Sequence, residues 1–182
     1  MIALKIVPLF CAASLAWPQE PVNAHALVIE DFQRHAAEYV KLHQKADAEL
    51  PRLKPTDSPA AIAHHEHKLA HRIREMRRSA KAGDIFTLEI TGEFHRLIGI
   101  AMQGRQATHV RQSLKHAEPV RLPLRVNDPY PADVPLQSTP PTLLLNLPML
   151  PMEVDYRVVD HALVLRDVGA NMIVDFIAEA IP

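Results

Sequence analysis

The distribution of proline is the feature that most restricts how this chain can fold. Nine of its 16 prolines lie between Pro119 and Pro151, in a chain of 182 residues. Because proline fixes φ and lacks an amide hydrogen, neither a regular helix nor a central strand can run through such a stretch. Residues 119–153 are therefore predicted to form a connector, with regular structure before and after it.

Two interpretations of this connector stay open. The sequence Pro148-Met149-Leu150-Pro151 has the P-x-x-P form of a polyproline recognition segment, and the alternative is an ordered or semi-rigid connector. We favour the second, because the segment also carries apolar residues that are expected to pack onto the body of the protein: Leu143, Leu144, Leu145 and Leu147.

Two long helices are predicted before the connector. Apolar residues recur at intervals of three and four over 23–50 and again over 59–81, which is typical of amphipathic helices. Pro51 and Pro55 end the first pattern, and Ser58 precedes the second as a helix cap. Since the loop between them is short, the two helices are expected to pack antiparallel.

Two shorter helices are predicted to follow, over 84–104 and 106–117. Asp84 is expected to cap the first of them. Gly92 and Gly99 lie inside it, and glycine is unfavourable in a helix interior, so they predict either a close helix contact or a broken segment.

The hydrophobic pattern changes to that of strands after the connector. Residues 154–159 and 162–166, separated by Asp160-His161, are predicted to form a β-hairpin. Residues 172–177 are predicted as a third strand, which completes a small antiparallel meander. A final helix over 172–180 is the alternative, but the Val and Ile content favours a strand.

This tail carries a family resemblance. The order Leu147-Pro148, Leu150-Pro151, then Tyr156-Arg157-x-Val159, Leu163-Val164-Leu165-x-Asp167 and Ile173-Val174-Asp175-x-Ile177 resembles the C-terminal module of periplasmic nickel/cobalt homeostasis regulators and related exported proteins. The resemblance implies an exported β-module and a link to metal homeostasis, and it assigns no metal ligand. The chain departs from the family at Val158, where Trp is usual, and at Ala170-Asn171, where Thr-Gly is usual.

The first residues have the pattern of a secretory signal. One positive charge in residues 1–5 is followed by 12 uncharged residues, 6–17, which are fewer than the roughly 20 that a membrane span needs. We predict a signal peptide of residues 1–16, with cleavage after Ala24 as the alternative. The single cysteine, Cys11, lies inside it, so the exported chain is expected to contain neither a disulfide nor a thiolate metal site.

The predicted fold class is α+β, in a chain of a length suited to one globular core. After the signal segment we expect a helical region over 23–118, the proline-rich connector over 119–153 and a small β-module over 154–182.

Histidine is abundant, with 11 residues, and four of them lie in the single run His64-His65-Glu66-His67-Lys68-Leu69-Ala70-His71. On a helix His64, His67 and His71 share one face, while His65 is directed toward the apolar side. Imidazole binds Zn, Cu, Ni and Co, so these three residues, with His43 as a partner from the first helix, are a candidate divalent-metal site. The alternative is a solvated polar face, because nearby cations oppose the binding of another cation.

A basic run follows the histidines on the same predicted helix. Its members are Arg72, Arg74, Arg77, Arg78 and Lys81. They are a candidate surface for an anionic envelope component, such as lipid headgroups or lipopolysaccharide, or for an acidic protein partner; the alternative is neutralisation by acidic residues of the C-terminal tail. The formal net charge of −1 gives no reason to expect binding to nucleic acid.

Sequence motifs of catalysis are lacking. The chain has no His-Glu-x-x-His, Gly-x-Ser-x-Gly, phosphate-binding loop or dinucleotide glycine motif. The first hypothesis is therefore an exported, periplasmic protein that acts by binding or as a structural component. A periplasmic divalent-metal binding or homeostasis protein is the second hypothesis, an envelope-surface interaction the third, and no catalytic residue is assigned.

Overall fold

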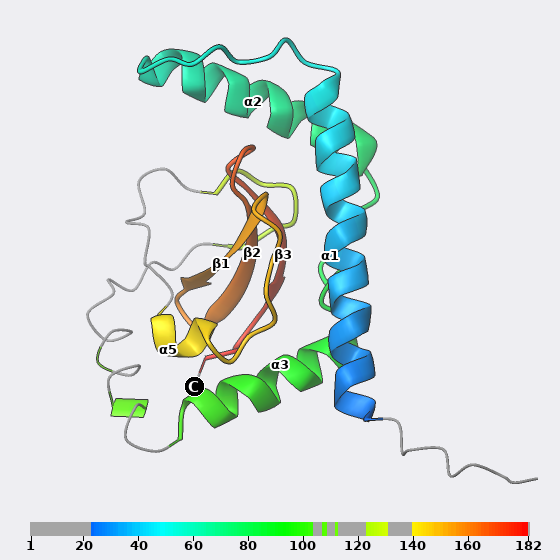
Figure 1. Ribbon diagram of the computed structural model, residues 1–182, viewed down its shortest axis with the longest axis vertical. Helices are drawn as coiled ribbons and strands as arrows, with labels where there is room; N and C mark the ends of the chain where they lie inside the picture. Colours follow the sequence, from blue (N-terminus) through cyan, green and yellow to red (C-terminus); the bar gives the residue numbers. More distant parts are fainter. Residues whose placement is uncertain (1–22, 104–106, 109–111, 113–122, 131–139, 182) are drawn as a thin grey trace, which may run out of the picture.

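The computed structural model describes residues 23–103, 107–108, 112, 123–130 and 140–181. Figure 1 shows a small sheet framed by helices on several sides. The α+β class is confirmed. The predicted signal segment 1–16 lies outside the described residues, as does most of the predicted helix 106–117.

Three longer helices surround the sheet. They are α1 (Ala24–Ala48), α2 (Pro59–Met76) and α3 (Leu88–Ala101), and the four-residue α5 (Pro141–Leu144) precedes the strands. In Figure 1, α1 runs along one side of the sheet, with α2 at one end and α3 at the other. The short loop after α1 led us to expect an antiparallel pair, but α2 crosses α1 instead of lying alongside it (Figure 1). Helix α2 contacts α1, and its Leu69 and Ile73 belong to the same buried cluster as residues of the strands.

The sheet is the predicted meander. Strands β1 (Val154–Val159), β2 (Ala162–Asp167) and β3 (Met172–Ile177) are antiparallel in the order β1-β2-β3. The strand interpretation of the last segment is therefore confirmed. Asp160 and Asn171 take positive φ angles in the two turns, a conformation that Asp and Asn tolerate better than most residues.

One hydrophobic core joins the helices to the sheet. Phe32 of α1 is fully buried, and its ring lies 4.8 Å from Phe94, 5.6 Å from Phe86 and 6.4 Å from Tyr156 of β1. A smaller cluster around Tyr130, Val164 and Ile173 buries further sheet residues. Helices and strands therefore depend on each other for burial of their apolar faces.

The described part of the connector packs against this body through two of the four leucines that were expected to do so. Leu143 and Leu147 are buried, whereas Leu144 and Leu145 are exposed. Around residues 127–130 the chain pairs with the edge of β3, where Asn127 N donates to Ile173 O and Ile173 N donates to Asp128 O, each over 2.9 Å.

Two helix ends differ from the expected ones. Helix α2 ends at Met76 instead of 81, and the guanidinium of Arg77 donates twice to the carbonyl of Val174. Helix α3 begins after Thr87 and not at Asp84, because the Asp175 carboxylate accepts the amide hydrogens of Ile85 and Phe86 and holds them outside a helical turn.

Helix α3 is continuous through Gly92 and Gly99, and a Cβ at either position would meet nothing within 4 Å. The expectation of a close contact or a break was therefore wrong. No helix among the described residues is long and apolar enough to cross a membrane.

Candidate functional site

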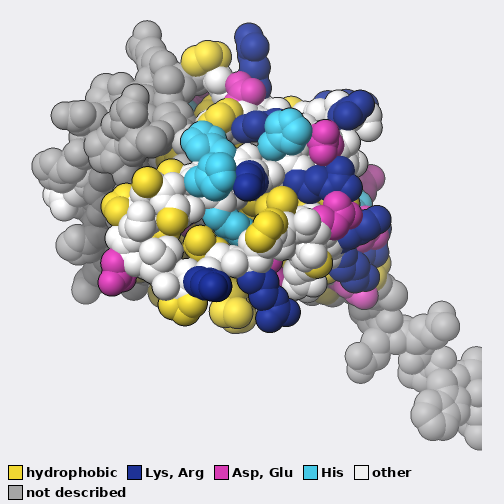
Figure 2. Space-filling model, turned by 90° about the horizontal axis from the view of Figure 1, so that it is seen from above, with side chains coloured by type: hydrophobic (Ala, Val, Ile, Leu, Met, Phe, Trp, Pro, Cys, Tyr) yellow, Lys and Arg dark blue, Asp and Glu magenta, His cyan; other side chains and the backbone are white. Residues whose placement is uncertain are grey.

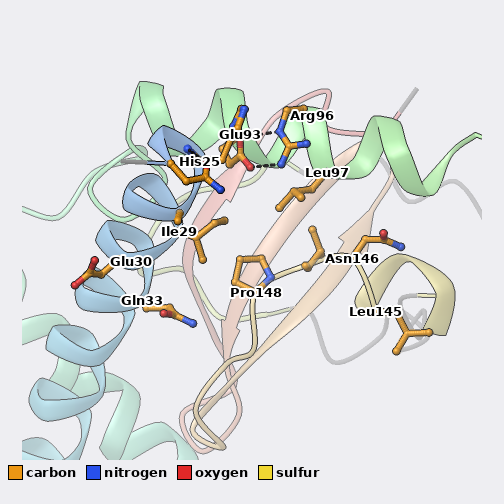
Figure 3. Close-up of a pocket in the computed structure, with 13 residues that line it drawn as sticks. His25, Ile29, Glu30, Gln33, Glu93, Arg96, Leu97, Leu145, Asn146 and Pro148 are labelled. Carbon is orange, nitrogen blue, oxygen red and sulfur yellow. Dashed lines mark hydrogen bonds and ion pairs between the residues drawn. The ribbon is translucent and has the colours of Figure 1, made fainter. Parts of the chain in front are cut away.

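A groove of about 700 Å³ lies between the first turns of α1, helix α3 and the chain that follows α5. Its middle is apolar: Figure 3 shows Ile29, Leu97 and Pro148 arranged around it. These residues come from three separate parts of the sequence. The groove therefore forms only when helices and connector pack together.

A polar network of three residues lies along one edge of the groove (Figure 3). Glu93 is buried, and its carboxylate is 2.6 Å from His25 Nδ1. Arg96 donates to the same carboxylate from Nε at 2.9 Å and from Nη2 at 2.5 Å. Two side chains that are partly exposed thus hold one buried acid in place.

Charge keeps this acid ionised. The hydrogen bonds from Arg96, and then those from His25, hold the pKa of Glu93 below its ordinary value against the opposing effect of burial. The edge of the groove thus presents an ionised carboxylate that is already paired, together with the remaining donors of Arg96.

The predicted metal-binding histidines lie on the surface. His64, His67 and His71 are exposed on α2, and Figure 2 shows histidine side chains beside Lys and Arg on this end of the molecule. His65 is half-buried and lies 3.2 Å from Asp47 of α1, which fits its predicted inward direction. Across the described ranges no three His, Cys, Asp or Glu side chains are grouped closely enough to hold a metal ion.

The structure does not bring His43 together with those three residues. Its Nδ1 lies 2.6 Å from Asp167 Oδ2, and the same oxygen accepts the Tyr39 hydroxyl hydrogen at 2.6 Å. Burial alone would lower the pKa of His43, but Asp167, with Asp47 and Glu153, outweighs burial and raises it. Burial and Asp167 raise the pKa of Tyr39 well above its ordinary value.

Four of the five basic residues have a partner within the protein, although Arg78 only lies 4.0 Å from Glu75 and its side chain is 80% exposed. Arg72 pairs with Glu49 and Glu75, and Arg74 donates to the carbonyl of Asn127. Arg77 lies over the Tyr39 ring at 5.0 Å. Arg78 and Lys81 remain exposed, so the surface that this run offers to a partner is smaller than the sequence indicated.

Sequence reasoning missed the residues around Glu93, although a signal exists. Glu93 follows Ile90 by three positions and precedes Leu97 by four, so a charged residue lies within the apolar face of α3. Asp175 is likewise a charged residue between two apolar neighbours in β3, whereas Asp167 follows Arg166 at the end of the otherwise apolar β2. A charged residue at a core position predicts a buried partner, but the partner itself cannot be read from one sequence.

Comparisons with family models, with curated proteins and with solved structures find no match to this chain.

Proposed function

We propose that this chain is an exported binding protein that acts without catalysis and takes its ligand in the groove between α1, α3 and the residues after α5. The observation that carries this proposal is the apolar wall of Ile29, Leu97 and Pro148 beside the Glu93 network (Figure 3). Ligand sites are typically concave and mostly apolar, with a few polar groups that fix the orientation of the ligand.

The groove favours an amphipathic ligand. An apolar body would lie against Ile29 and Leu97, and a polar group would face Arg96 and His25. Arg96 has five N–H donors, of which Glu93 engages only part, so the polar group is a hydrogen-bond acceptor such as a carboxylate or sulfonate.

A role without catalysis is supported by how the buried acids are used. Glu93 is paired with Arg96 and His25, Asp167 with Tyr39 and His43, and Asp175 with backbone amides of the loop before α3. Each of these carboxylates joins separate elements of the fold, which is a structural task.

Export is proposed on the signal pattern of residues 1–16. Asn23 accepts the backbone amide hydrogen of His25 and caps α1, so cleavage after Ala16 keeps this cap, whereas cleavage after Ala24 removes it. The mass of the exported chain should therefore correspond to a first residue Trp17. Exported material that retains Met1 would contradict the proposal.

Binding in the groove is tested with anilinonaphthalene sulfonate, an amphipathic anion whose fluorescence rises in apolar surroundings. Ile29→Gln should weaken its binding about tenfold, because this change places an amide in the apolar wall. Ile100→Gln is the matched control, since Ile100 is exposed on α3 and does not line the groove. Equal binding to both variants, or none to the unaltered protein, would reject the groove as the site.

A further inference from the structure

Charge is unevenly distributed along this chain. Residues 52–81, which run from the loop after α1 to just beyond α2, carry eight Lys or Arg and three Asp or Glu, a formal charge of +5. The whole chain carries −1, so all other residues together carry −6. In Figure 1 the loop and α2 form one end of the molecule. The sequence of this end is therefore basic, and the rest of the sequence is acidic.

Three acidic side chains near this end are already held by residues of α2. Arg72 pairs with both Glu49 and Glu75. His65 lies 3.2 Å from Asp47. Arg72 and His65 therefore satisfy these acids, so the acids are not needed as partners by the more exposed cations of the same end.

Five of the eight cations are exposed: Arg52, Lys54, Lys68, Arg78 and Lys81. Among the described residues, no carboxylate forms an ion pair with Lys54 or Lys68. On α2, His64, Lys68 and His71 follow each other by four and three positions, so Lys68 lies on the same outer face as the exposed histidines. Figure 2, which looks onto this end, shows Lys, Arg and His side chains beside hydrophobic ones.

The loop also presents an apolar side chain. Leu53 is 43% exposed and belongs to neither buried cluster of the described residues. Its neighbours Arg52 and Lys54 are both exposed. An exposed leucine between two cations is typical of segments that lie on a membrane surface, because the cations meet the lipid phosphates while the apolar side chain enters the boundary with the acyl chains.

We propose that this basic end, formed by the exposed residues of the loop 52–54 and by Lys68 and Arg78 of α2, binds the surface of an anionic phospholipid bilayer. Lys54 and Lys68 lie at the headgroups, and Leu53 reaches the boundary below them. The opposite sign of the remaining sequence supports this orientation, since an anionic surface attracts the basic end and repels the acidic remainder.

Binding at the basic end does not depend on the amphipathic groove. The loop 52–54, Lys68 and Arg78 do not line the groove. The groove is formed by the first turns of α1 and by α3, which lie away from α2 in Figure 1. A chain held on a bilayer by its basic end would therefore keep the groove open to its ligand.

The test uses the exported chain that begins at Trp17, because the apolar residues before it would bind lipid by themselves. Co-sedimentation measures binding to vesicles of phosphatidylglycerol mixed with phosphatidylcholine. Lys54→Gln and Lys68→Gln should each weaken binding about fivefold, since each removes one cation from the anionic surface. Lys41→Gln, at an exposed position in the middle of α1, is the matched control and should bind like the unaltered chain.

A second pair of variants tests the contact with the apolar boundary. Leu53→Ser should weaken vesicle binding about threefold, because less apolar surface leaves water. Leu88→Ser is its control, since Leu88 is 89% exposed on α3. If Leu53→Ser binds the vesicles as tightly as Leu88→Ser, the surface does not meet a bilayer.

The proposal is also overturned if vesicles of phosphatidylcholine alone bind the chain equally well, or if Lys54→Gln and Lys68→Gln bind like Lys41→Gln. Binding to soluble polyglutamate but not to the mixed vesicles would assign the basic end to an acidic protein partner instead. Binding of anilinonaphthalene sulfonate should be the same in all these variants, so failure here is separable from failure of the groove.

Discussion

His43 of α1 lies 2.6 Å from the carboxylate of Asp167, the last residue of β2, and this buried contact joins the longest helix to the sheet. Both carboxylate oxygens are occupied by donors: Oδ2 accepts from Tyr39 and His43, and Oδ1 from the Ala170 amide. If asparagine replaced Asp167, its NH2 group would face a donor in either orientation of the side chain: Tyr39 and His43 on one side, or the Ala170 amide on the other.

Asp167→Asn should therefore lower the free energy of unfolding by about 2–4 kcal/mol, because a buried charged acceptor is lost and its donors remain. Urea unfolding followed by circular dichroism measures the change. Asp160→Asn, in the exposed turn between β1 and β2, should stay within about 0.5 kcal/mol. A similar small effect at Asp167 would show that this carboxylate does not hold α1 to the sheet.

Asp175 plays the corresponding part for the loop before α3. It is fully buried in β3 and accepts amide hydrogens from Gly83, Ile85 and Phe86 at 2.8–3.0 Å. Asp175→Asn should accelerate hydrogen exchange at the Ile85 and Phe86 amides at least about tenfold, since a loss of 1.4 kcal/mol locally has that effect. The exposed Asp57→Asn is the control, and unchanged exchange in both variants would contradict this role.

Phe32 is the aromatic side chain at which α1, α3 and β1 meet. It is fully buried among Phe86, Phe94 and Tyr156. Phe32→Ala should cost about 3–5 kcal/mol in the free energy of unfolding, through lost burial and the cavity left behind. Leu88→Ala, at a residue that is 89% exposed, should cost less than about 0.5 kcal/mol. If both variants lost the same free energy of unfolding, Phe32 would not be at the centre of the hydrophobic core.

The Glu93 network predicts a dependence of stability on acid pH. Because Arg96 and His25 hold the folded pKa of Glu93 below its ordinary value of 4.5, the pair stabilises the protein above that pH. This contribution, about 1 kcal/mol or less because Arg96 is partly exposed, is lost as the pH falls through the lowered folded pKa. Thermal unfolding from pH 7 to pH 3 measures it.

Glu93→Gln should remove this part of the pH dependence, leaving a shallower decline below pH 4.5 than in the unaltered protein. Glu89→Gln, an exposed change in the first turn of the same helix, serves as the control. If the thermal stability of both variants falls equally below pH 4.5, the ionisation of Glu93 does not contribute to the stability of the protein.

Most elements of the fold could be predicted from periodicity, and most contacts could not. The repeats of apolar residues placed α1, α2 and the three strands, because each element must bury one face. The end of α2 at Met76 depends on Arg77 reaching Val174, almost 100 residues later, and the start of α3 depends on Asp175. Such long-range contacts leave no periodic signal in the segment that they shape.

In the candidate sites, too, local sequence patterns could be recognised, but the partners from distant parts of the chain could not. The run from His64 to His71 was easy to find, but its members are mostly exposed, whereas His43 acquires its surroundings from Asp167 and Glu153 in the last third of the chain. Glu93 could have been singled out as a charged residue on an apolar helix face. Its partner His25 comes from another helix and could not.

Asp167 and Asp175 also limit when, during synthesis of the chain, the buried hydrogen bonds can form. Both acceptors are made near the end of synthesis, yet the donors that link them to the helical part of the fold, from Tyr39 to Phe86, are made in the first half of the chain. Until the final strands arrive, those donors and the aromatic face around Phe32 lack their permanent partners. The contacts that close the fold thus span about half the chain or more, so this network can be complete only after the last strands have been made.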